Sequence, residues 1–343
     1  MTQDIANDRR IDPRLKPLLS LVPQTTESDV ESREVLLAEA NAPAALEAAE
    51  MLRGLMDMCD TEEAAPSTGL RIHTEKITSS PDGNSINLQV IRPDTGDILP
   101  CVYYIHGGGM ATMSCFDGMY RGWGKIIAAN GVAVVMVDFR NCVTASSAPE
   151  IEPFPAGLND CLSGLRWVVG NAGVLGIDAA AVTVAGESGG GNLTLACALS
   201  LKRSGDLGLV KGFYALCPYI AGQWPNPEYP SSIENNGILL NLHSNRGAVG
   251  YGIEAFNEGN PLAWPAFATV DDLAGLPPVI ISVNECDPLR DEGIVFYRLL
   301  LEAGVSARCR QVMGTMHGTE IFNIACPDIS RDTARDIAGF ARA

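Results

Sequence analysis

Residues 182–190 read Val-Thr-Val-Ala-Gly-Glu-Ser-Gly-Gly, and this stretch decides the fold. An apolar run leads directly into Gly186-Glu-Ser-Gly-Gly190, and a helical stretch begins near Asn192. A strand, a tight turn and a helix are what a nucleophile elbow requires, because bulky residues at the two glycines would collide with neighbouring elements. The adjacent helix N-terminus favours negative charge developing beside the hydroxyl. We therefore predict that Ser188 is a nucleophile, the alternative being a tight glycine turn without chemistry.

Working outward from this turn, short apolar runs alternate with helical stretches. The expected strands are 72–78, 86–91, 102–105, 132–137, 182–185, 213–216, 279–283 and 307–312. The expected helices between them are 118–129, 156–169, 192–203 and 291–303. Strands without clean polar alternation, separated by amphipathic helices, are typical of a parallel sheet covered on both faces. The fold class is therefore α/β, with a mainly parallel central sheet.

A second glycine motif, His106-Gly-Gly-Gly109, follows the strand that ends near residue 105. Successive glycines let backbone N–H groups approach a ligand atom without side-chain obstruction. Paired with a serine elbow, this is the HGGG type of oxyanion loop. The alternative is a flexible loop after an edge strand. We expect His106 to support this loop through hydrogen bonds rather than to act as a base.

A nucleophilic serine needs a base and an orienting acid. Of the four histidines (73, 106, 243 and 317), His317 lies in a glycine-flanked loop after the last strand, where the chain order Ser, Asp, His predicts the base. Asp287 follows the strand 279–283 and precedes a proline, so it is the expected acid, with Glu285 as the main alternative. Asp291 and Glu292 are expected to stabilise the first turn of the next helix.

Two segments stand outside the alternating pattern. Residues 1–65 are predicted to be an N-terminal helical cap segment, with one helix starting at a Ser28-x-x-Glu31 box. Residues 66–343 form the expected catalytic domain, interrupted by a second cap insertion at about 221–265. We expect the insertion's aromatic residues to line the substrate pocket, the alternative being that they only pack the cap onto the core. These residues are Trp224, Tyr229, Tyr251, Phe256 and Trp264.

Charge, apolar runs and cysteine spacing exclude several classes of function. The 41 acidic and 24 basic residues give a formal charge of −17, which argues against nucleic acid as a partner and favours a neutral small molecule. No apolar run is long enough to span a bilayer, and the polar N-terminus is not a secretory signal. The ten cysteines include no CxxC pair, so we expect reduced, buried thiols, no metal site and a cytoplasmic location.

Taken together, His106-Gly-Gly-Gly109, Gly186-Glu-Ser-Gly-Gly190, the segment 287–293 and His317-Gly318 resemble the hormone-sensitive-lipase-like (bacterial family IV) carboxylesterases. The resemblance implies an α/β-hydrolase fold with a helical cap and no cofactor. It implies a serine carboxylesterase that works through an acyl-enzyme. From the residues expected to line the pocket, we expect short- to medium-chain or bulky carboxylic esters as substrates. The implied site consists of the triad Ser188, Asp287 and His317, and of an oxyanion hole formed by the N–H groups of Gly108, Gly109 and Gly189.

The chain departs from the family pattern at two places. Gly189 stands where the family commonly has alanine, and residues 139–144 differ from the family's usual run after the fourth strand. Near that run we expect Asp138 and Arg140 to form a buried structural pair. Two other functions stay open: a catalytically silent ligand receptor on the same fold, against which the retained His317 argues, and an amide hydrolase. The sequence leaves the oligomeric state open, a homo-oligomer included.

Overall fold

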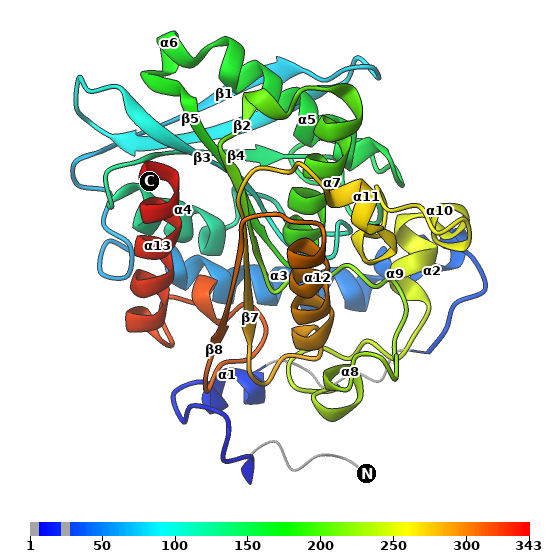
Figure 1. Cartoon of the computed structure of the whole chain (residues 1–343). Coiled ribbons are helices and arrows are strands. Elements are labelled where there is room, and N and C mark those ends of the chain that lie inside the picture. The colour runs from blue at the N-terminus through cyan, green and yellow to red at the C-terminus, as the bar shows by residue number, and fades with distance from the viewer. Residues whose placement is uncertain (1–6, 22–27) are drawn as a thin grey trace.

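The computed structural model describes residues 7–21 and 28–343, and an eight-stranded sheet forms its centre (Figure 1). The strands are β1 (Leu70–Thr78), β2 (Ser85–Pro93), β3 (Leu99–Ile105), β4 (Ala133–Asp138), β5 (Ile177–Glu187), β6 (Gly212–Leu216), β7 (Val279–Asn284) and β8 (Ala307–Val312). Their order across the sheet is β1-β2-β4-β3-β5-β6-β7-β8. Strand β2 runs antiparallel to both of its neighbours, and the pairs from β4 to β8 are parallel. The predicted mainly parallel sheet is confirmed.

The helices are α1 (Lys16–Leu21), α2 (Arg33–Ala40), α3 (Pro43–Asp57), α4 (Gly118–Ala128), α5 (Ala156–Gly170), α6 (Ala172–Leu175), α7 (Gly189–Ser204), α8 (Ser231–Glu234), α9 (Arg246–Tyr251), α10 (Ile253–Asn257), α11 (Val270–Leu273), α12 (Arg290–Glu302) and α13 (Pro327–Arg342). They cover both faces of the sheet. Figure 1 shows α4 and α13 on one side and α5, α7 and α12 on the other.

Strand β4 shows why the sheet needs cover on both sides. Val135 and Val137 belong to the apolar cluster under α5 and α7, whereas Val134 and Met136 belong to the cluster under α4 and α13. Alternate side chains of a strand point to opposite faces, so a wholly apolar strand is stable only between two helical layers. The continuous apolar runs of the sequence therefore become the buried parallel strands.

The N-terminal helices and the insertion between β6 and β7 lie at one end of the sheet (Figure 1). A small third cluster joins them: Ile11 and Leu15 pack with Ile238 of the insertion and with Met316. The helix expected to start at Ser28 starts instead at Arg33, because Ser32 is its N-cap and accepts a hydrogen bond from the Val35 N–H.

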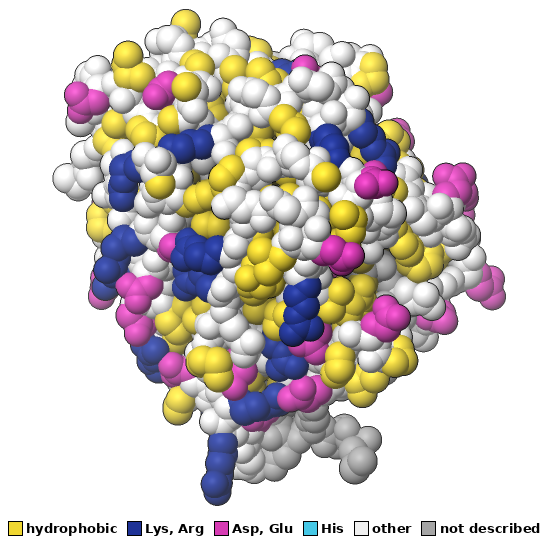
Figure 2. Space-filling model, in the orientation of Figure 1, with side chains coloured by type: hydrophobic (Ala, Val, Ile, Leu, Met, Phe, Trp, Pro, Cys, Tyr) yellow, Lys and Arg dark blue, Asp and Glu magenta, His cyan; other side chains and the backbone are white. Residues whose placement is uncertain are grey.

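All ten cysteines lie within the described residues and are free thiols; nine are buried and Cys309 is half-buried. Among the helices described, none combines the length and apolar character that crossing a bilayer requires. On the face shown in Figure 2, Lys and Arg side chains are scattered among acidic and apolar ones.

Candidate active site

Ser188 lies at the sharp turn between β5 and α7. Its backbone has φ 56° and ψ −120°, a conformation uncommon for a residue with a side chain. The Ser188 N–H donates to the carbonyl oxygen of Leu216 on β6 at 3.0 Å, which ties the turn to the next strand. A side chain at Gly190 would overlap the carbonyl oxygen of Ile105, and one at Gly186 would lie 2.6 Å from the same atom. Glycine is therefore required on both sides of the serine.

The oxyanion loop after β3 also uses left-handed backbone. Gly108 and Gly109 have φ of 86° and 63°, and Met110 and Met113, which follow, have φ of 58° and 74°. Non-glycine residues in this region are held there only when the surroundings over-determine them, and such residues cluster at functional sites. The loop presses against the start of α7, since a methyl group on Gly189 would lie 2.8 Å from the Gly109 nitrogen.

His317 and Asp287 are hydrogen-bonded, with 2.8 Å between His317 Nδ1 and Asp287 Oδ2. The other carboxylate oxygen of Asp287 accepts the N–H of Leu289 at 2.9 Å, so both oxygens are fixed. Burial by itself lowers the pKa of His317, but the Asp287 carboxylate and the Cys217 sulfur outweigh it and raise that pKa well above its usual value. The pair is thus an imidazole oriented and made more basic by a buried carboxylate.

The alternative residues have other partners. Glu285 Oε2 accepts the N–H of Gly314 at 2.7 Å, which commits its carboxylate to the histidine loop's backbone. His106 is fully buried, stacks on Phe139 with 4.3 Å between ring centroids, and places Nδ1 3.0 Å from the Gly107 carbonyl oxygen. His243 places Nε2 2.8 Å from the carbonyl oxygen of Ser232 in the insertion. The contacts of His106 agree with a supporting role.

Ser188, His317, Gly108 and Gly109 line one cavity of about 340 Å³. Its other walls are almost wholly apolar and come from the N-terminal segment, the insertion, α4 and the oxyanion and histidine loops: Leu18, Leu52, Leu55, Met56, Met113, Met119, Leu239, Leu240, Leu242, Met316, Ile321 and Phe322. A second cavity, of about 540 Å³, shares Gly109 and Tyr219 with the first. Its walls are more polar and include Ser28, Glu39, Thr112 and Arg246.

The expectation that the insertion's aromatic residues line the pocket is wrong for these two cavities. Trp264 packs edge-on against Tyr251 and Phe256, with ring centroids 5.6 and 6.3 Å away, and Trp224 stacks on Tyr219 at 4.6 Å. Large rings bury most surface by packing against each other, so they form the base of the insertion. Leucine and methionine side chains line the cavity. Of Met110 and Met113, which we also expected near the pocket from their place beside the oxyanion loop, Met113 lines it.

The predicted pair of Asp138 and Arg140 does not form. Asp138 accepts hydrogen bonds from Ser114, Cys115 and Ser147. Arg140 binds Asp160 at 2.8 Å and Asp82 at 2.6 Å. Asp138 and Arg140 are two positions apart at the end of β4, which is why we expected them on the same face. Each instead binds residues of neighbouring segments that are distant in the sequence, and no sequence pattern indicates those contacts.

Sequence reasoning missed the part played by Glu187, the residue before the serine. It is buried, and its two carboxylate oxygens accept hydrogen bonds from the hydroxyls of Tyr104 and Tyr120 at 2.7 Å each. The Tyr120 hydroxyl in turn accepts the N–H of Gly107 at 3.0 Å. Burial raises the pKa of Glu187 to about 7, although both tyrosines oppose the shift. Glu187 therefore links the elbow to the start of the oxyanion loop.

A metal ion would need a cluster of ligand atoms. Within residues 7–21 and 28–343, the buried side chains of Cys217, Asp287 and His317 have ligand atoms within 4.8 Å of one another. The imidazole and the carboxylate of this group are hydrogen-bonded to each other, which is the arrangement of a histidine base oriented by an acid rather than of two metal ligands.

Comparison with known proteins agrees with this geometry. Residues 102–321 match the family described as the alpha/beta hydrolase fold. The chain is 32% identical to carboxylesterase NlhH of Mycobacterium tuberculosis, covering 100% of this chain and 99% of that protein. The structure of esterase Est22 is 62% identical with a TM-score of 0.96, covering 98% of this chain and 99% of the other. Brefeldin A esterase, a bacterial homologue of human hormone-sensitive lipase, is 36% identical with a TM-score of 0.85, covering 98% and 94%.

These relatives are esterases, and they do not favour a silent receptor or an amide hydrolase. Three observations indicate the same activity, hydrolysis of carboxylic esters: the fold, the serine elbow with its glycine loop, and the full-length similarity to carboxylesterases. The chain is a serine carboxylesterase, and it belongs to the hormone-sensitive-lipase-like family of the α/β-hydrolase fold.

Proposed function

We propose that Ser188, His317 and Asp287 carry the ester hydrolysis, with the N–H groups of Gly108, Gly109 and Gly189 as the oxyanion hole. The observation that carries this proposal is the cavity of about 340 Å³ that Ser188, His317 and two of the glycines share. The 2.8 Å bond between Asp287 and His317 supports the assignment of the acid.

In the proposed mechanism, the Ser188 hydroxyl attacks the ester carbonyl carbon while His317 Nε2 takes its proton. The carbonyl oxygen becomes an oxyanion that backbone N–H groups of the glycine loop stabilise. His317 returns the proton to the leaving alcohol, which leaves an acyl-Ser188 ester. Water, deprotonated by His317, then attacks the acyl carbonyl carbon. The bond from that carbon to the Ser188 oxygen breaks, His317 returns the proton to this oxygen, and the carboxylic acid leaves. Asp287 holds the imidazole tautomer and stabilises its charged form.

The substrates proposed are neutral esters with short to medium acyl chains. The cavity is apolar, lies at the small end of the usual range for ligand pockets, and has Leu18, Leu52 and Leu240 of the cap in its wall. Residues 1–65 and about 221–265 are proposed to act as the cap, since both supply walls of this cavity. Free thiols throughout the chain support a reducing compartment such as the cytoplasm.

The test is turnover of p-nitrophenyl esters of increasing acyl length. A structure of esterase Est22 contains p-nitrophenol, the alcohol of such esters, so the leaving group has a precedent in a 62% identical protein. We expect kcat/KM to peak at short or medium chains and Ser188→Ala to lower kcat by about 10⁵-fold or more with an unchanged melting curve. Activity retained in folded Ser188→Ala protein would overturn the assignment of the nucleophile.

A further inference from the structure

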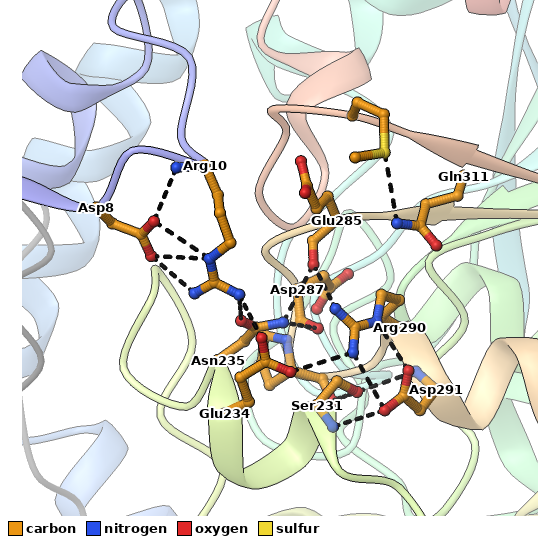
Figure 3. Close-up of polar contacts among 12 residues, drawn as sticks. Asp8, Arg10, Ser231, Glu234, Asn235, Glu285, Asp287, Arg290, Asp291 and Gln311 are labelled. Atoms are coloured by element: carbon orange, nitrogen blue, oxygen red, sulfur yellow. Dashed lines mark hydrogen bonds and ion pairs between the residues drawn. The ribbon is translucent and has the colours of Figure 1, made fainter.

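A short helix of the insertion, α8, holds the turn that carries Asp287 (Figure 3). Ser231 is the first residue of α8, and Asn235 directly follows the helix. The two are four positions apart, so their side chains lie on the same face. Both are completely buried although one is a hydroxyl and the other an amide. Burying a polar group costs free energy unless it is hydrogen-bonded, and both side chains have hydrogen-bond partners in the turn that carries Asp287.

The amide of Asn235 is bonded on both of its sides. Asn235 Nδ2 donates to the carbonyl oxygens of Glu285 at 3.2 Å and Asp287 at 3.1 Å. Its Oδ1 accepts a hydrogen bond from Arg10 Nη1 at 3.0 Å. One side chain of the cap thus holds two of the three carbonyl groups of residues 285–287, the turn that follows β7.

Ser231 fixes the next part of the same turn. Its hydroxyl donates to the carbonyl oxygen of Pro288 at 3.0 Å and accepts the N–H of Asp291 at 3.0 Å. The Ser231 N–H donates to the Asp291 carboxylate at 2.7 Å. Ser231 of α8 therefore holds both the residue after Asp287 and the first turn of α12.

The N-terminal arm, residues 7–21, completes the arrangement from outside. Arg10 reaches Glu234 at 2.5 Å as well as Asn235, and Asp8 binds the other side of its guanidinium at 2.7 Å (Figure 3). Such two-sided guanidinium contacts are specific in geometry. The backbone of the arm also reaches the histidine loop, because the Asp12 N–H donates to the Gly314 carbonyl oxygen at 2.9 Å.

We propose that Asn235, backed by Arg10, is a positioning residue that holds the Asp287 turn where its carboxylate meets His317. The inference rests on the proposed function of Asp287 and His317. Neither Asn235 nor Arg10 lines the catalytic cavity. Asn235 acts on the backbone that carries the Asp287 carboxylate. The docked arm and insertion thereby complete the catalytic geometry as well as the cavity wall.

The test compares Asn235→Ala with a matched control, Asn323→Ala. Asn323 is also buried, and its amide donates to a carbonyl of the N-terminal segment, that of Cys59, at 2.9 Å. Both variants lose a buried amide that ties the cap to the core. Asn235→Ala is expected to lower kcat by about 10- to 100-fold with little change in KM, because small misplacements of catalytic groups cost rates of this order. Asn323→Ala is expected to lower only the melting temperature.

Two readouts separate positioning from general destabilisation. In Asn235→Ala the pKa governing the acid limb of the rate profile should fall, and the low-field proton resonance of the His317 Nδ1–H should shift upfield, because Asp287 bonds it less well. In an Asp287→Asn background, Asn235→Ala should add almost nothing to the loss in kcat. Full additivity, or an acid limb unchanged from wild type, overturns the proposal.

Arg10→Met keeps the proposal testable if Asn235→Ala fails to fold. It removes the outer contact alone and should shift the same pKa in the same direction by a smaller amount, whereas Arg14→Met, whose partners are Asp12 and Asp328, should not. A failure of the proposed triad would look different: Asp287→Asn itself would then be nearly harmless. A severe Asp287→Asn beside an Arg10→Met that behaves like Arg14→Met would refute the positioning role alone.

Discussion

Gly189 faces the backbone of Met110 so closely that a methyl group on Gly189 would lie 2.5 Å from the Met110 nitrogen. No real Cβ atom approaches a backbone atom to this distance, so the oxyanion loop and the start of α7 are fitted to glycine. The alanine common at this position in the family would require the loop to stand further away.

Gly189→Ala is therefore expected to lower kcat by about 10²-fold, the scale on which one oxyanion donor acts. The check is kcat on a short p-nitrophenyl ester, with Gly173→Ala in α6 as the control, because a Cβ at Gly173 meets open space. Wild-type turnover in folded Gly189→Ala would mean that the loop relaxes without loss.

Substitutions of the two acids after β7 should differ clearly in their effect on kcat. Asp287→Asn is expected to lower kcat by about 10³–10⁴-fold, because the amide favours the wrong imidazole tautomer. Glu285→Gln should have a small effect, since the Glu285 carboxylate binds the Gly314 N–H. Steady-state kinetics of both variants at the optimal pH gives the answer, and the reverse ranking would show that Glu285 is the acid.

The rate should rise with pH as His317 loses its proton. Because its pKa lies above the ordinary imidazole value of 6.5, the acid limb of kcat/KM should have its midpoint above 6.5. The measurement is kcat/KM from pH 5 to 9 on an ester whose chemistry limits the rate. A flat profile over that range contradicts a histidine base.

Glu187 should make stability depend on pH. Its folded-state pKa of about 7 exceeds the ordinary 4.5, so the folded protein holds the proton more tightly than the unfolded chain does. Stability from this group is complete below about pH 4.5 and is lost as the pH rises to about 7. Glu187→Gln should gain melting temperature relative to wild type across that window. Glu63→Gln, on the surface, should show no such trend.

The cap should set the length of the acyl chain that the enzyme prefers in its ester substrates. Leu52 and its neighbour Met51 both lie on α3, but Leu52 lines the catalytic cavity and Met51 is 73% exposed. Leu52→Trp should shift the preferred p-nitrophenyl ester to shorter chains by filling the cavity, and Met51→Trp should leave the profile as it was. An identical profile for both variants would place the acyl chain elsewhere.

The sequence predicts β4, β6 and β7 well because these strands are continuous apolar runs that are fully buried. The pattern is weaker elsewhere: β1 and β8 carry polar, partly exposed residues, and β5 begins at Ile177, five residues before the expected start. The four helices expected in the catalytic domain follow from the same pattern, and α12 begins at Arg290, one residue before the expected start. The C-terminal helix α13 was not expected. Local motifs also identify Ser188 and the glycine loop. The contacts that join distant segments are different: Arg10 and Asn235 are 225 positions apart, and no local pattern pairs them. The partners of Arg140 were missed for the same reason.

The accessibility of the free cysteines can report which part of the molecule unfolds first. Cys59 belongs to the N-terminal cap segment, and Cys286 and Cys326 lie in the cluster that contains Ile11 and Leu15, so the docked cap buries all three thiols. Cys101, Cys161 and Cys197 lie in the main core. A thiol-reactive label applied in short pulses and mapped by mass spectrometry would therefore time the release of the cap separately from the loss of the sheet, with Cys309 marking the folded baseline.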